Sequence, residues 1–274
     1  MFLVTGANGQ LGNELKLLLG ERAVFTDYED LDITSEEAVK EFVKGKDFAA
    51  IINCAAYTAV DKAEGDEERA FQINAVGPAN LAATGIPLIQ ISTDYVFDGT
   101  GCRPYVEDDE TRPCSAYGRT KLAGEKLVLE KASTAVIIRT AWLYSSFGGN
   151  FVKTMRRLGA EKSSLNVVFD QIGTPTYARD LAGAIVHILP QIKPGMKEVY
   201  HFSNEGVCSW YDFALKIMEK SGLNCEVKPI ESKDYPTPAK RPHYSVLNKA
   251  KIKADFGLEI NHWEKSLADC LARL

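Results

Sequence analysis

The fold of this chain is decided by residues 1–12, MFLVTGANGQLG, in which a short apolar run passes directly into three glycines. The run Phe2 to Thr5 predicts a buried strand, and the spacing of apolar residues from Gln10 to Leu19 predicts a helix. A glycine-rich turn between a strand and a helix lets backbone N–H groups approach a pyrophosphate, although the spacing G-x-x-G-x-x-G also suits a turn without a ligand. We expect a dinucleotide here, bound by Gly6, Asn8, Gly9, Gln10, Leu11 and Gly12.

Short β-rich runs continue to alternate with amphipathic stretches through the first half of the chain. Strands are expected at residues 23–26, 49–53, 88–92 and 135–139, and helices at residues 36–43, 67–82 and 116–130. This order predicts an α/β fold built on a doubly wound parallel Rossmann sheet.

Beyond Thr140 the alternation loosens and predicts a smaller C-terminal substrate lobe. Helices are expected at residues 151–159, 179–189, 209–221 and 263–271. Three prolines between residues 234 and 242 fix φ and remove backbone donors, so this segment is expected to be an extended loop. We expect residues 1–145 and about 177–200 to form the dinucleotide-binding domain, and residues of about 146–176 and 201–274 to form the lobe.

Composition excludes several classes of function. The chain has 274 residues, of which 45% are hydrophobic and 25% charged, as in ordinary folded proteins. Its net charge of −5 offers no broad basic field for nucleic acid or for an anionic membrane. A start without a basic, cleavable leader, and apolar runs too short to span a bilayer, favour a cytoplasmic protein.

Residues that could bind a metal or form a hydrolase site are scattered. The six cysteines include no C-x-x-C pair, and the four histidines are accompanied by no G-x-S-x-G elbow. Glu14 could ligate a metal, but a carboxylate favoured near a helix start is the simpler interpretation. We therefore expect no metal site, no disulfide framework and no hydrolase triad.

An acidic residue after the second predicted strand bears on the choice of cofactor. Asp27 follows Gly6 by 21 positions, close to the offset at which a carboxylate accepts hydrogen bonds from the adenosine ribose. Because no Arg or Lys lies between residues 23 and 33 to neutralise a 2′-phosphate, NADH is favoured and NADPH remains possible. Asp27 could instead be a turn residue. Asp32 and Ile33 would flank the adenine, although Asp32 could equally cap the next helix.

Small residues after the third predicted strand would let the ribose and pyrophosphate lie against the backbone. Ala55 and Ala56 serve this purpose, with Thr58 close behind, but tight strand–helix packing would also explain the alanines. Asn74 falls inside a predicted helix, where its propensity is poor, so a specific hydrogen-bonding role beside the cofactor is expected.

The constellation richest in chemistry is Tyr117-Gly118-Arg119-Thr120-Lys121, preceded by Thr93 at the end of the fourth predicted strand. Tyr117 and Lys121 share one helix face, and an ammonium beside a phenol favours the phenolate and lowers its pKa. Thr93 could give a substrate carbonyl oxygen a second hydrogen bond. A lone Y-x-x-x-K is common by chance, but in this order the residues point to carbonyl reduction.

Longer motifs connect these residues. They are Ala55 to Glu64 (AAYTAVDKAE), Ser92 to Gly99 (STDYVFDG), Arg139 to Trp142 (RTAW), Asp170 to Thr176 (DQIGTPT) and Tyr235 to Pro238 (YPTP). With the glycine turn and the Y-x-x-x-K motif, they resemble the extended short-chain dehydrogenase/reductase family over nearly the whole chain.

The resemblance implies that Thr93, Tyr117 and Lys121 form the catalytic set, with Lys121 also bonding the nicotinamide ribose. It implies hydride transfer from reduced cofactor to the 4-keto carbon of a dTDP-linked 6-deoxysugar, as in converting dTDP-4-dehydro-L-rhamnose to dTDP-L-rhamnose. Substrate contacts are expected from Asp94, Val96, Trp142 and Arg241. Trp142 could instead pack under a loop, and Arg241 could be a surface arginine without a function.

Two departures from neighbouring patterns refine this interpretation. Thr93 is followed by Asp94 and Tyr95, not by the Asp-Glu pair of sugar-nucleotide dehydratases, so dehydration is disfavoured. The arginine that many NADPH-dependent relatives carry after the second strand is absent. Two alternatives stay open, a noncatalytic dinucleotide-binding regulatory subunit and an NAD-dependent nucleotide-sugar epimerase. The sequence is compatible with a monomer or a homodimer.

Overall fold

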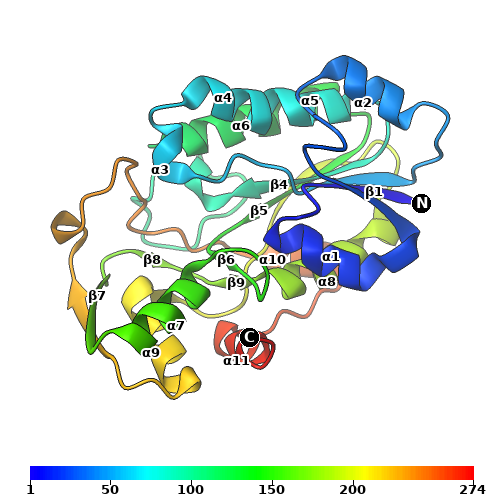
Figure 1. The fold of residues 1–274 in the computed structure, drawn as a ribbon. Coiled ribbons are helices and arrows are strands. Elements are labelled where there is room, and N and C mark those ends of the chain that lie inside the picture. The colour runs from blue at the N-terminus through cyan, green and yellow to red at the C-terminus, as the bar shows by residue number, and fades with distance from the viewer.

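A six-stranded parallel sheet forms the centre of the computed structural model, which describes residues 1–274 (Figure 1). The strand order is β2-β1-β3-β4-β5-β10, so the direction of winding reverses between β1 and β3. The strands are β1 (Phe2–Thr5), β2 (Ala23–Thr26), β3 (Ala50–Asn53), β4 (Leu88–Thr93), β5 (Ala135–Thr140) and β10 (Lys197–His201). The predicted doubly wound sheet is confirmed.

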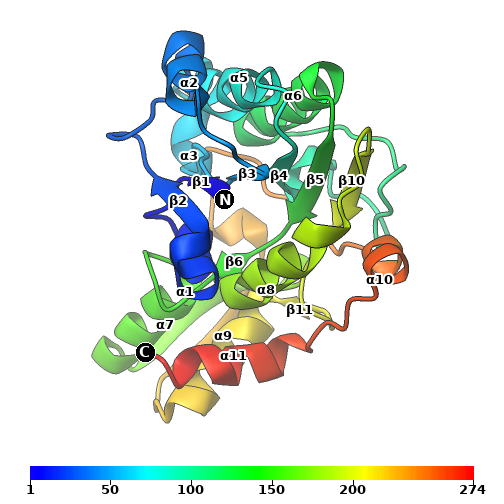
Figure 2. The same ribbon diagram turned by 90° about the vertical axis from the view of Figure 1, so that its right-hand side faces the viewer.

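Helices cover both faces of this sheet because alternate strand residues are apolar on each side. Val4, Ile52 and Ile89 face one core and Leu3, Ile51 and Leu88 face the other. The first core is closed by α1 (Gln10–Leu19) and α8 (Ala178–Ile188), and the second by α2 (Glu36–Val43), α5 (Gly77–Ala82) and α6 (Ala116–Lys131). Figure 2 shows the two helical layers on either side of the strands.

The helix predicted over residues 67–82 is present but irregular. It consists of α4 (Glu67–Phe71), a π-helical turn from Gln72 to Val76, and α5, and it follows the short α3 (Val60–Ala63). Single π-turns inside helices are frequent at functional sites. This turn carries Asn74, whose side chain is considered below.

The C-terminal lobe has an apolar core of its own, which includes Tyr144, Phe213, Ile217 and Trp263. Its helices are α7 (Phe151–Glu161), α9 (Trp210–Ser221) and α11 (Trp263–Leu271). Its short strands are β6 (Leu143–Tyr144), β7 (Ser164–Val168), β8 (Ile172–Gly173), β9 (Thr176–Tyr177), β11 (Cys208–Ser209) and β12 (Glu226–Ile230). The lobe lies below the sheet in both ribbon views (Figures 1 and 2).

One segment differs from the predicted division of the chain. The sequence boundary placed everything after residue 200 in the lobe, but α10 (Ala250–Phe256) packs on β10. Ile252 and Phe256 join Tyr200 in the core beneath the main sheet. The apolar faces of α10 and β10 therefore return this segment to the dinucleotide-binding domain. None of the helices has the length and apolar character required to cross a bilayer.

Candidate active site

Several of the expected site residues lie at the carboxyl edge of the sheet. Gly6 follows β1, Asp27 follows β2, Ala55 follows β3 by two residues, and Asp94 follows β4. In parallel sheets this edge, at the point where the winding reverses, is where ligands bind. The strand register brings Thr5 opposite Asn53, so the glycine turn meets the end of β3.

Gly6 and Gly12 of the glycine turn lie so close to neighbouring backbone atoms that neither position can hold a side chain. Gly6 has φ +64, and a Cβ there would lie 2.5 Å from the Ala55 nitrogen. A Cβ at Gly12 would lie 2.5 Å from the Gly6 carbonyl oxygen. Gly9 caps α1 without a side-chain acceptor, which leaves the first N–H groups of the helix for another partner. The cradle therefore fits a dinucleotide pyrophosphate.

The side chains of the turn have other partners. The Asn8 side chain accepts a hydrogen bond from Lys16 Nζ at 3.1 Å, and Gln10 binds the Leu143 carbonyl and Asn150. Leu11 is buried in the core. With these side chains occupied and the Asn8 nitrogen bound to Asp27, the backbone donors left for a ligand are the N–H groups of the first turn of α1.

Asp27 lies beside the turn, as expected. Its carboxylate accepts hydrogen bonds from the Asn8 and Tyr28 backbone nitrogens, both at 2.8 Å. These bonds fix a negative charge where β2 ends next to the glycine turn. Asp32 accepts from the Thr34 nitrogen and hydroxyl, so it shapes the turn before α2. Ile33 is buried against Gly77, so its side chain packs in the core.

Asn74 is an exception among the expected cofactor contacts. Its side chain is buried and accepts from the Tyr57 nitrogen at 2.9 Å while donating to the Tyr57 carbonyl and the Thr120 hydroxyl. All its polar atoms are therefore used within the protein. Asn74 holds the segment that follows β3, including Ala55, Ala56 and the exposed Thr58, against α6.

We expect Asn74→Ala to lower the free energy of unfolding by about 1–3 kcal/mol, because it leaves the buried partners of the amide without hydrogen bonds. Urea unfolding followed by circular dichroism measures the change. Asn166→Ala, at an exposed position of β7, is the matched control and should change stability little. Equal stability of Asn74→Ala and the wild-type protein would contradict this role.

Tyr117 lies in the first turn of α6, and the helix start is fixed by Ser115. The Ser115 hydroxyl accepts a hydrogen bond from the Gly118 nitrogen at 3.1 Å, a standard N-cap. The Tyr117 ring meets Tyr95 edge to face, with centroids 5.6 Å apart. The Thr93 side chain is close enough to the phenol to lower its pKa by hydrogen bonding. Thr93 and Tyr117 are therefore brought together.

Lys121 is buried, and its ammonium reaches across to β4. Lys121 Nζ donates to the Ile91 carbonyl at 2.6 Å. The Cys54 thiol lies near enough to the amine to influence the pKa of Lys121. Burial lowers the pKa of Lys121 to about 8. The amine thus lies between β4 and the residue that follows β3.

The expected effect of Lys121 on the Tyr117 phenol is not met. Burial raises the pKa of Tyr117 above its ordinary value, with Asp94 and Tyr95 adding to the rise, and Lys121 makes no contribution to the shift. The physical reason is that desolvation disfavours the phenolate, while the ammonium is bound to the Ile91 carbonyl. The phenol is protonated at neutral pH with or without this shift, and the shift makes it a weaker acid than a free phenol.

Asp94 is a buried carboxylate next to this pair. Its Oδ1 accepts from the Thr93 hydroxyl at 3.0 Å, while Oδ2 has no hydrogen-bond partner. Burial raises the pKa of Asp94 to about 6. The Asp94 side chain is enclosed by the protein, so it affects the site through the Thr93 hydroxyl, from which it accepts a hydrogen bond.

Arg241 reaches the same edge from the proline-bearing loop, but it is already paired. It donates to Asp61 Oδ2 at 2.8 Å and to the Tyr95 hydroxyl at 3.1 Å. The sequence analysis did not identify Asp61 and Tyr95 as its partners. Only the position of Tyr95, two residues after Thr93, could have suggested one of them. Arg241 therefore ties the loop to the domain that carries Tyr117.

Trp142 and Val96 take different positions. Trp142 has φ 48, the one positive value among non-glycine residues, and stacks on Trp210 at a centroid distance of 3.6 Å. It is partly exposed and packs over Gly173. Val96 is fully buried with Phe97, so it has no surface for a ligand to contact and serves packing instead.

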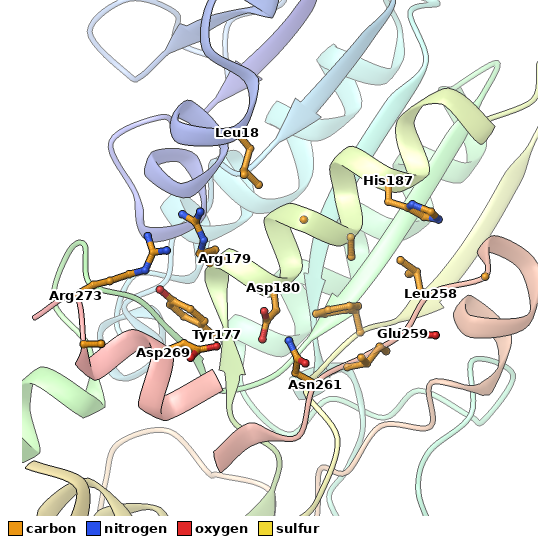
Figure 3. A pocket seen from close by; sticks show the side chains of 16 residues that line it. Leu18, Tyr177, Arg179, Asp180, His187, Leu258, Glu259, Asn261, Asp269 and Arg273 are labelled. Carbon is orange, nitrogen blue, oxygen red and sulfur yellow. The ribbon is translucent and has the colours of Figure 1, made fainter. Parts of the chain in front are cut away.

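A cavity of about 740 Å³ lies away from this edge, between α1, α8 and α11 (Figure 3). Arg179 and Arg273 lie at one end of it and His187 at the other. Behind it, the buried carboxylate of Glu14 pairs with Arg179 at 3.5 Å and accepts from Ser145. None of the residues lining this cavity belongs to the expected site.

Comparison with known proteins adds to this geometry. A family model described as RmlD substrate binding domain matches residues 1–274. A dTDP-4-dehydrorhamnose reductase of Mycolicibacterium smegmatis is 44% identical over 282 residues, which cover 98% of this chain and 84% of the relative. The crystal structure of a dTDP-4-dehydrorhamnose reductase from Clostridium acetobutylicum matches with a TM-score of 0.95 and 45% identity, covering 99% of this chain and 98% of the other.

A second solved structure carries a cofactor. The dTDP-4-dehydrorhamnose reductase from Bacillus anthracis, in complex with NADP, matches with a TM-score of 0.95 and 38% identity, covering 100% of this chain and 99% of the other. Likeness of this degree over nearly the full length of each protein shows that the chain belongs to the dTDP-4-dehydrorhamnose reductase family.

Proposed function

We propose that this chain reduces the C4 carbonyl of dTDP-4-dehydro-L-rhamnose to give dTDP-L-rhamnose, with a nicotinamide cofactor held along the carboxyl edge of the sheet. The observation that carries the proposal is the arrangement of Thr93, Tyr117 and Lys121 at that edge, beside a glycine turn that admits only backbone. When bound, the reduced nicotinamide supplies the hydride.

The side chains of the chain supply the proton and the electrostatics. Tyr117, which is protonated at neutral pH, donates to the carbonyl oxygen as negative charge develops there. The Thr93 hydroxyl, which donates to Asp94 in this structure, turns to become the second donor. Lys121, fixed by the Ile91 carbonyl, provides positive charge under the site. These roles follow from placement and burial.

The substrate side is proposed to be formed by Asp94, Trp142 and Arg241. The partly exposed face of Trp142 suits an apolar sugar surface, and Asp94 would act on the substrate through the Thr93 hydroxyl that it binds. Arg241 carries a positive charge shared with Asp61, and a diphosphate would compete with that carboxylate.

The function is tested by following cofactor oxidation with several 4-keto sugar nucleotides and identifying each product. We expect one reduced cofactor consumed for each dTDP-L-rhamnose formed. An epimerised sugar without net cofactor consumption would instead indicate an epimerase. Cofactor binding without turnover of any of these substrates would indicate a regulatory subunit.

For cofactor choice, we propose that Asp27 favours NADH over NADPH. Its carboxylate is fixed beside the glycine turn by two backbone donors and would repel a 2′-phosphate. The NADP complex of the Bacillus anthracis relative makes this preference a question for experiment.

We expect Asp27→Ala to lower the ratio of kcat/KM for NADH to kcat/KM for NADPH about 10-fold. Removing the carboxylate relieves its repulsion of the 2′-phosphate of NADPH. Steady-state kinetics with both cofactors measure this ratio. Glu29→Ala, which removes an exposed carboxylate of the same turn, serves as the control. An unchanged ratio in Asp27→Ala would show that Asp27 does not set the cofactor preference.

A further inference from the structure

A buried ion pair lies directly behind the catalytic lysine. Glu125 follows Lys121 by one helical turn on α6, and its side chain is 3% exposed. Both of its carboxylate oxygens bind Arg139, with Nε to Oε1 at 3.0 Å and Nη2 to Oε2 at 2.8 Å. The Ser92 hydroxyl donates to the same carboxylate. A bidentate pair with a further donor fixes orientation as well as distance.

This pair joins the elements that carry the proposed catalytic set. Glu125 belongs to the helix of Tyr117 and Lys121, while Ser92 directly precedes Thr93 on β4. Arg139 lies on β5 in register with Ser92. Ile91, whose carbonyl accepts a hydrogen bond from the Lys121 ammonium, directly precedes Ser92 on the same strand. A shift of Glu125 would therefore move α6 relative to the end of β4.

The Arg139 guanidinium makes further contacts besides its ion pair with Glu125. Its Nη1 approaches the Glu107 carbonyl at 3.3 Å and His201 Nε2 at 3.4 Å, and its guanidinium lies 5.2 Å from the Phe97 ring centre. Burial and Arg139 together lower the pKa of His201 to about 3, so the imidazole is neutral. A saturated network of this kind rigidifies the elements it connects.

We propose that Glu125, held by Arg139 and Ser92, is a positioning residue that sets Lys121 and Thr93 in the geometry needed for carbonyl reduction. The inference rests on the proposed function. Buried polar networks behind a reactive site are the means by which its side chains are kept within a fraction of an ångström of the productive arrangement.

The charge of Glu125 gives the proposal a signature besides rate. Two titratable groups face Lys121, the Glu125 carboxylate on its own helix and the Cys54 thiol at the end of β3. Burial favours the neutral amine of Lys121, whereas Glu125 favours its ammonium. Glu125→Gln removes that negative charge and leaves Arg139 uncompensated, and both changes favour the neutral amine. The loss of activity on raising the pH should begin at a lower pH.

The test compares Glu125→Gln and Ser92→Ala with the wild-type protein, using reduced cofactor and the 4-keto sugar nucleotide. For Glu125→Gln we expect kcat to fall about 10- to 100-fold with little change in KM. The alkaline limb of its profile should move about one pH unit lower. Ser92→Ala removes only one hydroxyl and should lower kcat about 2- to 10-fold.

A matched control is available in the lobe. Ser266 is also a fully buried hydroxyl that donates to a carboxylate, that of Asp180, and Ser266→Ala should leave kcat and its pH profile unchanged. Ser92→Ala keeps the test decisive if Glu125→Gln fails to fold. The proposal is overturned if Ser92→Ala, and Glu125→Gln where it folds, keep the wild-type kcat and pH profile per folded molecule. An inactive wild-type protein would instead refute the proposed function.

Discussion

Tyr117→Phe is expected to lower kcat for reduction of the 4-keto sugar nucleotide by about 10²- to 10⁴-fold, the range in which general acids contribute. The Tyr117 phenol lies beside Thr93 and is protonated at neutral pH, so it is the proposed proton donor. The ring remains in the variant, so its packing against Tyr95 is preserved. Steady-state kinetics measure the loss, and fluorescence titration of the cofactor measures binding.

The matched control for this variant is Tyr200→Phe. Tyr200 is a buried tyrosine of β10 whose hydroxyl binds Asp255 at 2.9 Å, far from the carboxyl edge of β4. It should keep the wild-type kcat. Full activity of Tyr117→Phe would show that another group donates the proton and that the assignment of this residue is wrong.

The second large effect concerns Lys121 and pH. Burial lowers its pKa to about 8, so the amine carries its charge below that pH and loses it above. Since the proposed mechanism uses the ammonium form, kcat/KM should decline as pH rises through about 8. Lys121→Met should lower kcat/KM about 10²-fold at neutral pH, and its residual activity should lack this alkaline limb.

The pH profile of kcat/KM reports the groups of the free enzyme, which makes it the appropriate measurement. Lys126→Met, on an exposed position of α6, is the control and should retain the limb. A wild-type profile that stays flat through pH 8 to 10 would contradict a requirement for the ammonium.

The sequence predicted the framework of the fold because its signals are local. The strand at Phe2–Thr5 and the helices at Gln10–Leu19 and Trp263–Leu271 begin and end as expected, since apolar periodicity decides them. The placement of α10 was missed because its contact with β10 joins residues far apart in the chain.

The candidate site likewise combines features that local sequence predicts with features that only the structure shows. The placement of the glycine turn, Asp27 and Thr93 follows from which residues end parallel strands, and that of Tyr117 from the start of a helix; both were predictable. The pKa of Tyr117 was not, because it depends on burial and on the carbonyl that Lys121 binds. Asn74 could be singled out as unusual within a helix, but only the structure shows that its amide binds Tyr57.

The most direct test of the account uses cofactor deuterated at the transferable position of the nicotinamide, with dTDP-4-dehydro-L-rhamnose as substrate. The account predicts dTDP-L-rhamnose carrying deuterium at C4, formed in equal amount to the cofactor oxidised, and a rate that collapses in Tyr117→Phe. Product without deuterium at C4, or an undiminished rate in the variant, would contradict it.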